Sequence, residues 1–65
     1  MYDFLLNKII TFDYGTGCID AGATAYVYRI QEPYVWVHFR QPVLAHNDIK
    51  LHVDVVMKHG RIVSI

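Results

Sequence analysis

The sequence has 65 residues, of which 54% are hydrophobic, 14% aromatic and 18% charged, and six basic and six acidic side chains give a formal net charge of zero. This composition is too apolar for a disordered segment, and the balanced charge excludes the strongly basic footprint that duplex DNA or an anionic membrane requires. A chain of about 60 residues buries only about 60% of its unfolded surface, so we expect one small domain over residues 1–65 that covers part of its apolar surface in a homo-oligomer, most simply a dimer.

Cysteine content and the amino-terminal residues indicate the compartment. Cys18 is the single cysteine, so no internal disulfide forms and no metal-type cysteine spacing exists. Residues 1–8 lack a basic region followed by a long apolar run, and no later run approaches membrane-spanning length. We therefore expect a soluble cytoplasmic protein that is not associated with a membrane.

The first fourteen residues predict a short turn followed by a strand. Asp3 is placed to cap one helical turn that folds Phe4 and Leu5 onto the core. Residues 7–14 alternate between apolar and polar side chains, which predicts a strand whose even positions face the core. Those positions are Ile10, Phe12 and Tyr14.

A glycine-rich segment follows, with three glycines within residues 15–22. Glycine permits the positive φ angles of turns and bulges, so this segment is predicted to be a loop. No lysine or helical pattern follows Gly15-Thr16-Gly17, which argues against a phosphate-binding loop. Cys18 lacks a neighbouring cation that would activate its thiol as a nucleophile.

Residues 24–41 read as a β-hairpin around Glu32-Pro33, with strands over residues 23–31 and 34–41. If Ile30 lies opposite Val35, cross-strand partners share a face, and two sets of side chains result. The set predicted to face the core is Tyr26, Tyr28, Ile30, Val35, Val37 and Phe39, and the set predicted to face outward includes Arg29, Trp36, His38 and Arg40.

The remaining residues favour two more strands. Pro42 is expected to end the hairpin, and a connection over residues 43–48 follows, with its turn at Asn47-Asp48. Residues 49–58 have some helical spacing, but apolar residues recur at every second position and valines favour a strand. A turn at His59-Gly60 then pairs this strand with a last one over residues 61–65, whose edge is expected to be exposed to another chain.

These elements predict an all-β fold: a five-stranded antiparallel meander that curls into a small barrel or a half-open sheet. A strand, a glycine-rich excursion and four further strands are compatible with an SH3-like barrel. That likeness is at the level of the fold and implies no function.

No catalytic, cofactor or metal signature is present. The four histidines, His38, His46, His52 and His59, have no metal-ligand spacing. No pair of acidic residues has a spacing that implies a shared acid and base. A chain this short also has little room for an enclosed substrate pocket. We therefore expect a protein that is not an enzyme and has no cofactor.

The outward face of the hairpin is the candidate binding surface, formed by Arg29, Tyr34, Trp36, His38 and Arg40. In the simplest interpretation, Arg29 lies over the Trp36 indole in a cation-π contact and only shields it. Trp, Tyr and Arg dominate interface energetics, so we expect a protein-protein interaction module of adaptor or inhibitor type that also self-associates. The alternative is a single-stranded nucleic-acid-binding small β-barrel in which Trp36 and His38 stack on bases while Arg29 and Arg40 contact phosphates.

Overall fold

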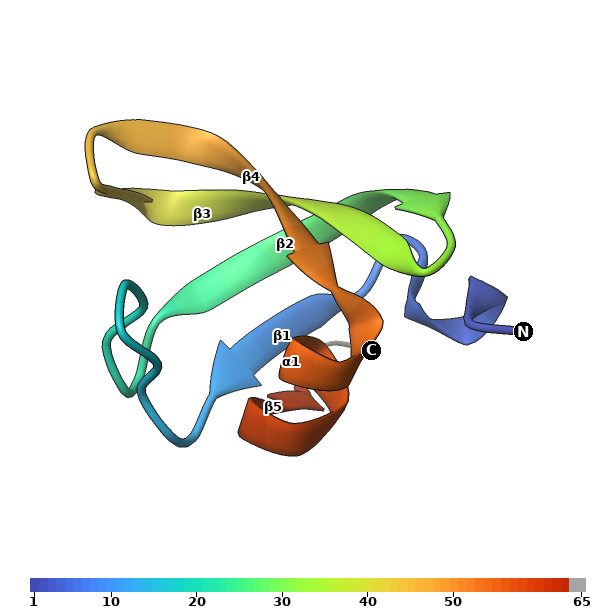
Figure 1. The fold of residues 1–65 in the computed structure, drawn as a ribbon, viewed down its shortest axis with the longest axis horizontal. Helices are drawn as coiled ribbons and strands as arrows, with labels where there is room; N and C mark the ends of the chain where they lie inside the picture. Colours follow the sequence, from blue (N-terminus) through green and yellow to red (C-terminus); the bar gives the residue numbers. More distant parts are fainter. Residues whose placement is uncertain (64–65) are drawn as a thin grey trace.

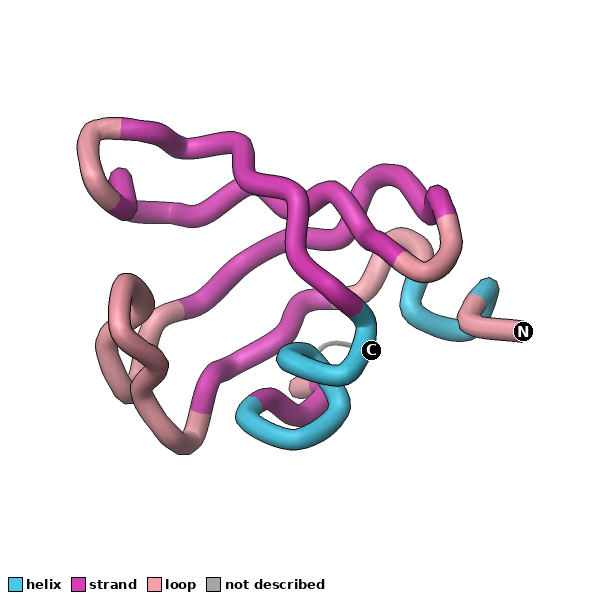
Figure 2. Tube along the Cα trace, in the orientation of Figure 1, coloured by secondary structure: helices cyan, strands magenta, loops and turns pink. Residues whose placement is uncertain are grey.

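The computed structural model describes residues 1–63 of the chain, as shown in Figures 1 and 2. Its elements, in chain order, are the 3₁₀ turn η1 (Asp3–Leu5), the strands β1 (Ile9–Phe12), β2 (Thr24–Gln31), β3 (Tyr34–Val43) and β4 (His46–His52), the helix α1 (Val53–His59) and the strand β5 (Gly60–Ile62).

All strands belong to one antiparallel sheet in the order β4-β3-β2-β1-β5. The sheet is not closed, because β4 and β5 are its two edges. The predicted all-β fold with a five-stranded antiparallel sheet is therefore confirmed, in its half-open form. The tip of the β3–β4 hairpin and the loop between β1 and β2 lie at the same end of the molecule (Figure 1).

The position of β5 differs from the predicted meander. The turn at His59-Gly60 was expected to pair the last strand with the one before it, but β5 pairs with β1 instead. Helix α1 carries the chain from the β4 edge to the opposite edge, where Arg61 lies opposite Thr11. The predicted strand over residues 61–65 is therefore present in part, and its last two residues lie outside the described part of the chain.

The core lies on one face of the sheet and is completed by α1, η1 and the glycine-rich loop. Phe12 of β1 and Phe39 of β3 stack with ring centroids 5.8 Å apart. The loop contributes Ile19, and the 3₁₀ turn contributes Leu5. The buried hydrophobic residues are Leu5, Ile10, Phe12, Ile19, Ala25, Val27, Val35, Val37, Phe39, Val43, Val53 and Val56.

A β-bulge changes the faces of β2 from those predicted. The register is as expected next to the turn, where Ile30 lies opposite Val35 and Arg29 opposite Trp36. Val27 then lies opposite Val37, so Tyr28 is an extra residue in β2. A bulge of this kind reverses the inside and outside positions of the residues before it.

The prediction that Tyr26 and Tyr28 face the core is consequently wrong. These side chains are 41% and 39% exposed, whereas Ala25 and Val27 are buried. In β3 the predicted faces are confirmed, with Val35, Val37 and Phe39 buried.

The predicted strand over residues 49–58 is also wrong in its second half, which forms α1. The His52 side chain accepts a hydrogen bond from the Asp54 backbone N–H at 3.1 Å and so caps the helix. Asp54 in the first turn and Lys58 in the last suit the helix dipole. The valine preference for strands is overridden because Val53 and Val56 are buried in the core from this helix.

Smaller differences occur at three places. Pro42 does not end β3 but lies within it, in the stretch where the register with β4 is irregular, a place that tolerates proline. The β3–β4 turn is at Leu44-Ala45, both at positive φ, rather than at Asn47-Asp48. Near the amino terminus, the N-cap of η1 is Tyr2 and Asp3 lies in the first turn instead of capping it, while Phe4 and Tyr14 are exposed instead of facing the core.

The inverted faces of β2 can be tested by comparing two alanine variants. Val27→Ala removes two fully buried methyl groups and should lower the free energy of unfolding by about 2 kcal/mol. Tyr28→Ala should lower it by less than about 1 kcal/mol, because the ring is partly in solvent. Urea unfolding followed by circular dichroism measures both. A larger loss for Tyr28→Ala would mean that the tyrosine belongs to the core.

The junction between α1 and β5 depends on Gly60. A Cβ atom at this position would lie 2.6 Å from Ile10 Cγ2 and 3.0 Å from the Val56 carbonyl oxygen. Gly60→Ala should therefore destabilise the protein by about 1 to 3 kcal/mol. Gly17→Ala is the matched control, because no atom of residues 1–63 lies within 4 Å of its added Cβ. Equal unfolding midpoints for the two variants would contradict this close approach.

Candidate interaction surface

On the side of the sheet opposite the core, we call the part formed by β2, β3 and β4 the outer face. Cross-strand pairing arranges its side chains in rows that run from β2 across β3 to β4. One row is Tyr26, His38 and Asp48, the next is Arg29, Trp36 and Lys50, and the third is Gln31, Tyr34 and His52, with Tyr28 in the bulge and Arg40 further along β3.

Trp36 lies at the centre of the outer face. Its row places Arg29 on one side and Lys50 on the other. The indole is half-buried, and its Nε1 donates a hydrogen bond to Gln31 Oε1 at 3.1 Å. The indole N–H is therefore satisfied while part of the ring is open to solvent.

The cation-π contact of this surface is made by a different pair from the predicted one. Lys50 Nζ lies 4.8 Å from the centre of the Tyr34 ring, and the His52 ring meets the same tyrosine edge-on at 5.5 Å. Arg29 is opposite Trp36, as predicted, but makes no cation-π contact with it among the described residues. Within residues 1–63 the cation-π contact therefore belongs to Lys50 and Tyr34, and Arg29 is only the cross-strand neighbour of Trp36.

The carboxylate of the outer face has a partner within the chain. His38 Nδ1 and Asp48 Oδ1 are 2.6 Å apart, and both side chains are more than half exposed. In the same row, the Tyr26 hydroxyl donates a hydrogen bond to Asn7 Oδ1 at 2.8 Å. These contacts hold the side chains of the row formed by Tyr26, His38 and Asp48 in place.

The cations of the outer face have no carboxylate partner within residues 1–63. The ion pairs of this part of the chain join Met1 to Glu32, His38 to Asp48, His52 to Asp54 and Arg61 to Asp13. Arg29, Arg40 and Lys50 are in none of them. The surface is therefore locally positive although the whole chain is neutral.

The structure brings all the predicted site residues onto this one surface and adds others. Arg29, Tyr34, Trp36, His38 and Arg40 lie on the outward side of β2 and β3. The residues that sequence reasoning did not assign to the site are Tyr26, Tyr28, Lys50 and His52. The alternation of apolar and polar residues already predicted that Lys50 faces outward. Its position beside Trp36 of β3 follows only from the strand pairing.

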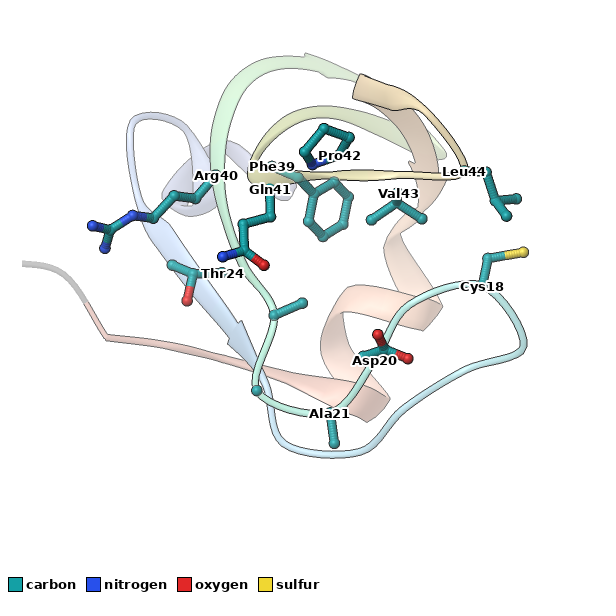
Figure 3. Close-up of a pocket in the computed structure, with 12 residues that line it drawn as sticks. Cys18, Asp20, Ala21, Thr24, Phe39, Arg40, Gln41, Pro42, Val43 and Leu44 are labelled. Atoms are coloured by element: carbon teal, nitrogen blue, oxygen red, sulfur yellow. The ribbon is translucent and has the colours of Figure 1, made fainter.

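Two open hollows lie near the tip of the β3–β4 hairpin. The first, of about 740 Å³, lies between the loop around Asp20 and the end of β3. Figure 3 shows Cys18 and Leu44 at one end of this hollow, and Arg40 pointing away from it. The second, of about 550 Å³, is more apolar and runs along β4, with Ile49, Leu51 and Val55 in its lining.

Potential metal ligands are dispersed over the described chain. His46 begins β4, His52 caps α1, and His59 ends the helix with a buried Nδ1 that has no hydrogen-bond partner within residues 1–63. In residues 1–63 no three histidine, cysteine or acidic side chains come together as metal ligands do. Cys18 is a free, exposed thiol in the loop between β1 and β2.

Comparison with protein-family models, with curated proteins and with solved structures finds no match to this chain. Over the described residues, none of the helices has the length and apolar character needed to cross a membrane.

Proposed function

We propose that this protein is a small, non-enzymatic protein-interaction module, of adaptor or inhibitor type, that binds an acidic segment of a partner protein on its outer face. The observation that carries the proposal is the row of Arg29, Trp36 and Lys50, in which a partly exposed indole lies between two cations that have no carboxylate partner within residues 1–63. We place this role in the cytoplasm, because a free, exposed Cys18 suits a reducing compartment.

The chemistry of the outer face matches that of interface hot spots. Trp, Tyr and Arg are the residues whose truncation costs most at protein interfaces, and they are concentrated here. Cations that have no carboxylate partner among residues 1–63 attract the carboxylates of a partner protein and speed its association. An acidic segment with an apolar residue to cover Trp36 satisfies both requirements.

A second candidate is binding to single-stranded nucleic acid, favoured by the same aromatic rings beside cations that the described residues leave without a carboxylate partner. In this candidate, bases stack on Trp36 and Tyr28 while phosphates contact Arg29 and Arg40. The Asp48 carboxylate on this face and the neutral chain weigh against it, because phosphate binding draws on an excess of positive charge. We therefore rank it below the protein partner.

Trp36→Ala should abolish capture of the partner and leave the fold intact, because the indole is on the outer face. The measurement is affinity capture from nuclease-treated extract of the native cell, quantified by mass spectrometry for the wild type and the variant. Met57→Ala is the matched control, since Met57 is an exposed hydrophobic residue on α1. If Trp36→Ala retains the same captured protein as the wild type, the outer face is not the binding surface.

Charge-matched variants test whether the partner is acidic. Arg29→Gln should weaken binding of the captured partner by roughly two- to tenfold and reduce its salt dependence, whereas Lys58→Gln on α1 should leave both unchanged. Titration with single-stranded DNA, followed by the emission of the chain's single tryptophan, separates the two candidates. A tight, steeply salt-dependent signal with DNA would favour nucleic acid over protein.

A further inference from the structure

Strand β4 is an open edge of the sheet, and the direction of its free backbone groups follows from the contacts of its neighbours. The Val53 N–H donates to the Pro33 carbonyl at 2.9 Å, toward the β3 side. Backbone groups alternate in direction along a strand, so those of Leu51 and Ile49 also point to β3. The N–H and C=O groups of Lys50 and Asp48 consequently point to the open edge.

The side chains of β4 are complementary to those of a second copy of the same strand. If a two-fold axis passes through Ile49 and relates two antiparallel β4 strands, each residue before Ile49 lies opposite the residue equally far after Ile49 in the second copy. Asp48 then lies opposite the second copy's Lys50, and Lys50 opposite its Asp48. On the inner side, Ile49 meets its own copy.

We propose that two copies of this chain associate through β4, antiparallel and centred on Ile49, so that a single sheet runs through the dimer. Lys50 and Asp48 exchange backbone hydrogen bonds with their counterparts, because these are the residues whose groups point outward. Their side chains form two symmetric ion pairs on the outer face. The open edge, which would otherwise template unwanted pairing, is thereby covered.

Other registers lack this complementarity. An axis at Asp48 would place two carboxylates opposite each other, and an axis at Lys50 would place two ammonium groups opposite each other. A shift by one residue between the strands would mix the polar outer side chains with the apolar inner ones. The charges of β4 therefore select the axis at Ile49 and favour a second copy over an unrelated strand.

The apolar hollow along β4 supports the same occupant. Successive residues from Asp48 to Leu51 line it, so it includes the edge of the strand as well as its inner side. Ile49 and Leu51 are only partly buried within one chain. Pairing across the axis covers Ile49 with its copy and brings Leu51 beside the second copy's Asn47, which removes apolar surface from water.

The dimer uses Asp48 and Lys50 at the β4 margin of the outer face, whereas the proposed binding of a partner protein centres on Trp36 of β3 and Arg29 of β2. Substitutions at Trp36 or Arg29 change partner binding and leave the contacts of the dimer in place, so the two proposals can fail independently. In each copy, the row that contains Trp36 ends at Lys50, which is next to the axis at Ile49. Dimerisation therefore joins the two outer faces into one larger surface without covering the indole. Loss of dimerisation would halve this surface, and loss of Trp36 would leave the dimer unchanged.

The test is sedimentation equilibrium of the wild type and of charge-reversal variants, each checked by circular dichroism. The wild type should be dimeric at micromolar concentration. Asp48→Lys and Lys50→Asp, each alone, place like charges opposite one another twice and should weaken self-association at least about tenfold. Asp20→Lys and Lys58→Asp make the same charge changes elsewhere and should remain dimeric.

Mixing the two edge variants gives the decisive result. Asp48→Lys and Lys50→Asp should associate with each other as a heterodimer, because both pairs across the axis become opposite in charge again. The double variant D48K/K50D should recover the homodimer, and it decides the matter if either single variant is unfolded. A monomeric wild type, single variants that still dimerise, or a mixture and a double variant that stay monomeric would each overturn the proposal.

Discussion

The outer face of the sheet depends on the bulge at Tyr28, where β2 carries one residue more than β3 opposite it. On the turn side of the bulge, Arg29 is brought next to Trp36. On the other side, Val27 and Ala25 are directed into the core, where they pack with the stacked Phe12 and Phe39. The same shift of one residue therefore supplies both the small side chains that the core needs and the tyrosines that the surface displays.

The route of the chain after β4 explains why one edge of the sheet is left open. Once His52 caps α1, the chain leaves the sheet, and Val53 and Val56 are buried against the core instead of extending the strand. The chain rejoins the sheet beside β1, and the close approach at Gly60 fixes this return. A β5 strand paired with β4 would have covered the edge on which the complementary charges lie.

Local patterns predicted the fold class, the hairpin turn and the faces of β3, because alternation and the proline at position 33 are properties of adjacent residues. The bulge at Tyr28 was not predictable, since tyrosine fits either face and the burial of Ala25 depends on distant partners. The helix was missed because valines favour a strand, and its cap is a histidine, an uncommon capping residue. The five predicted site residues do share a surface, but the place of Lys50 beside Trp36 required knowledge of the strand pairing.

A bulge also increases the right-handed twist of the strand that contains it. The rows on either side of Tyr28 are therefore rotated relative to each other, so the outer face is twisted rather than flat. A flexible chain can follow that twist, because its backbone adjusts from one row to the next. The twist of the sheet at the bulge therefore suits an extended, flexible segment better than a flat surface.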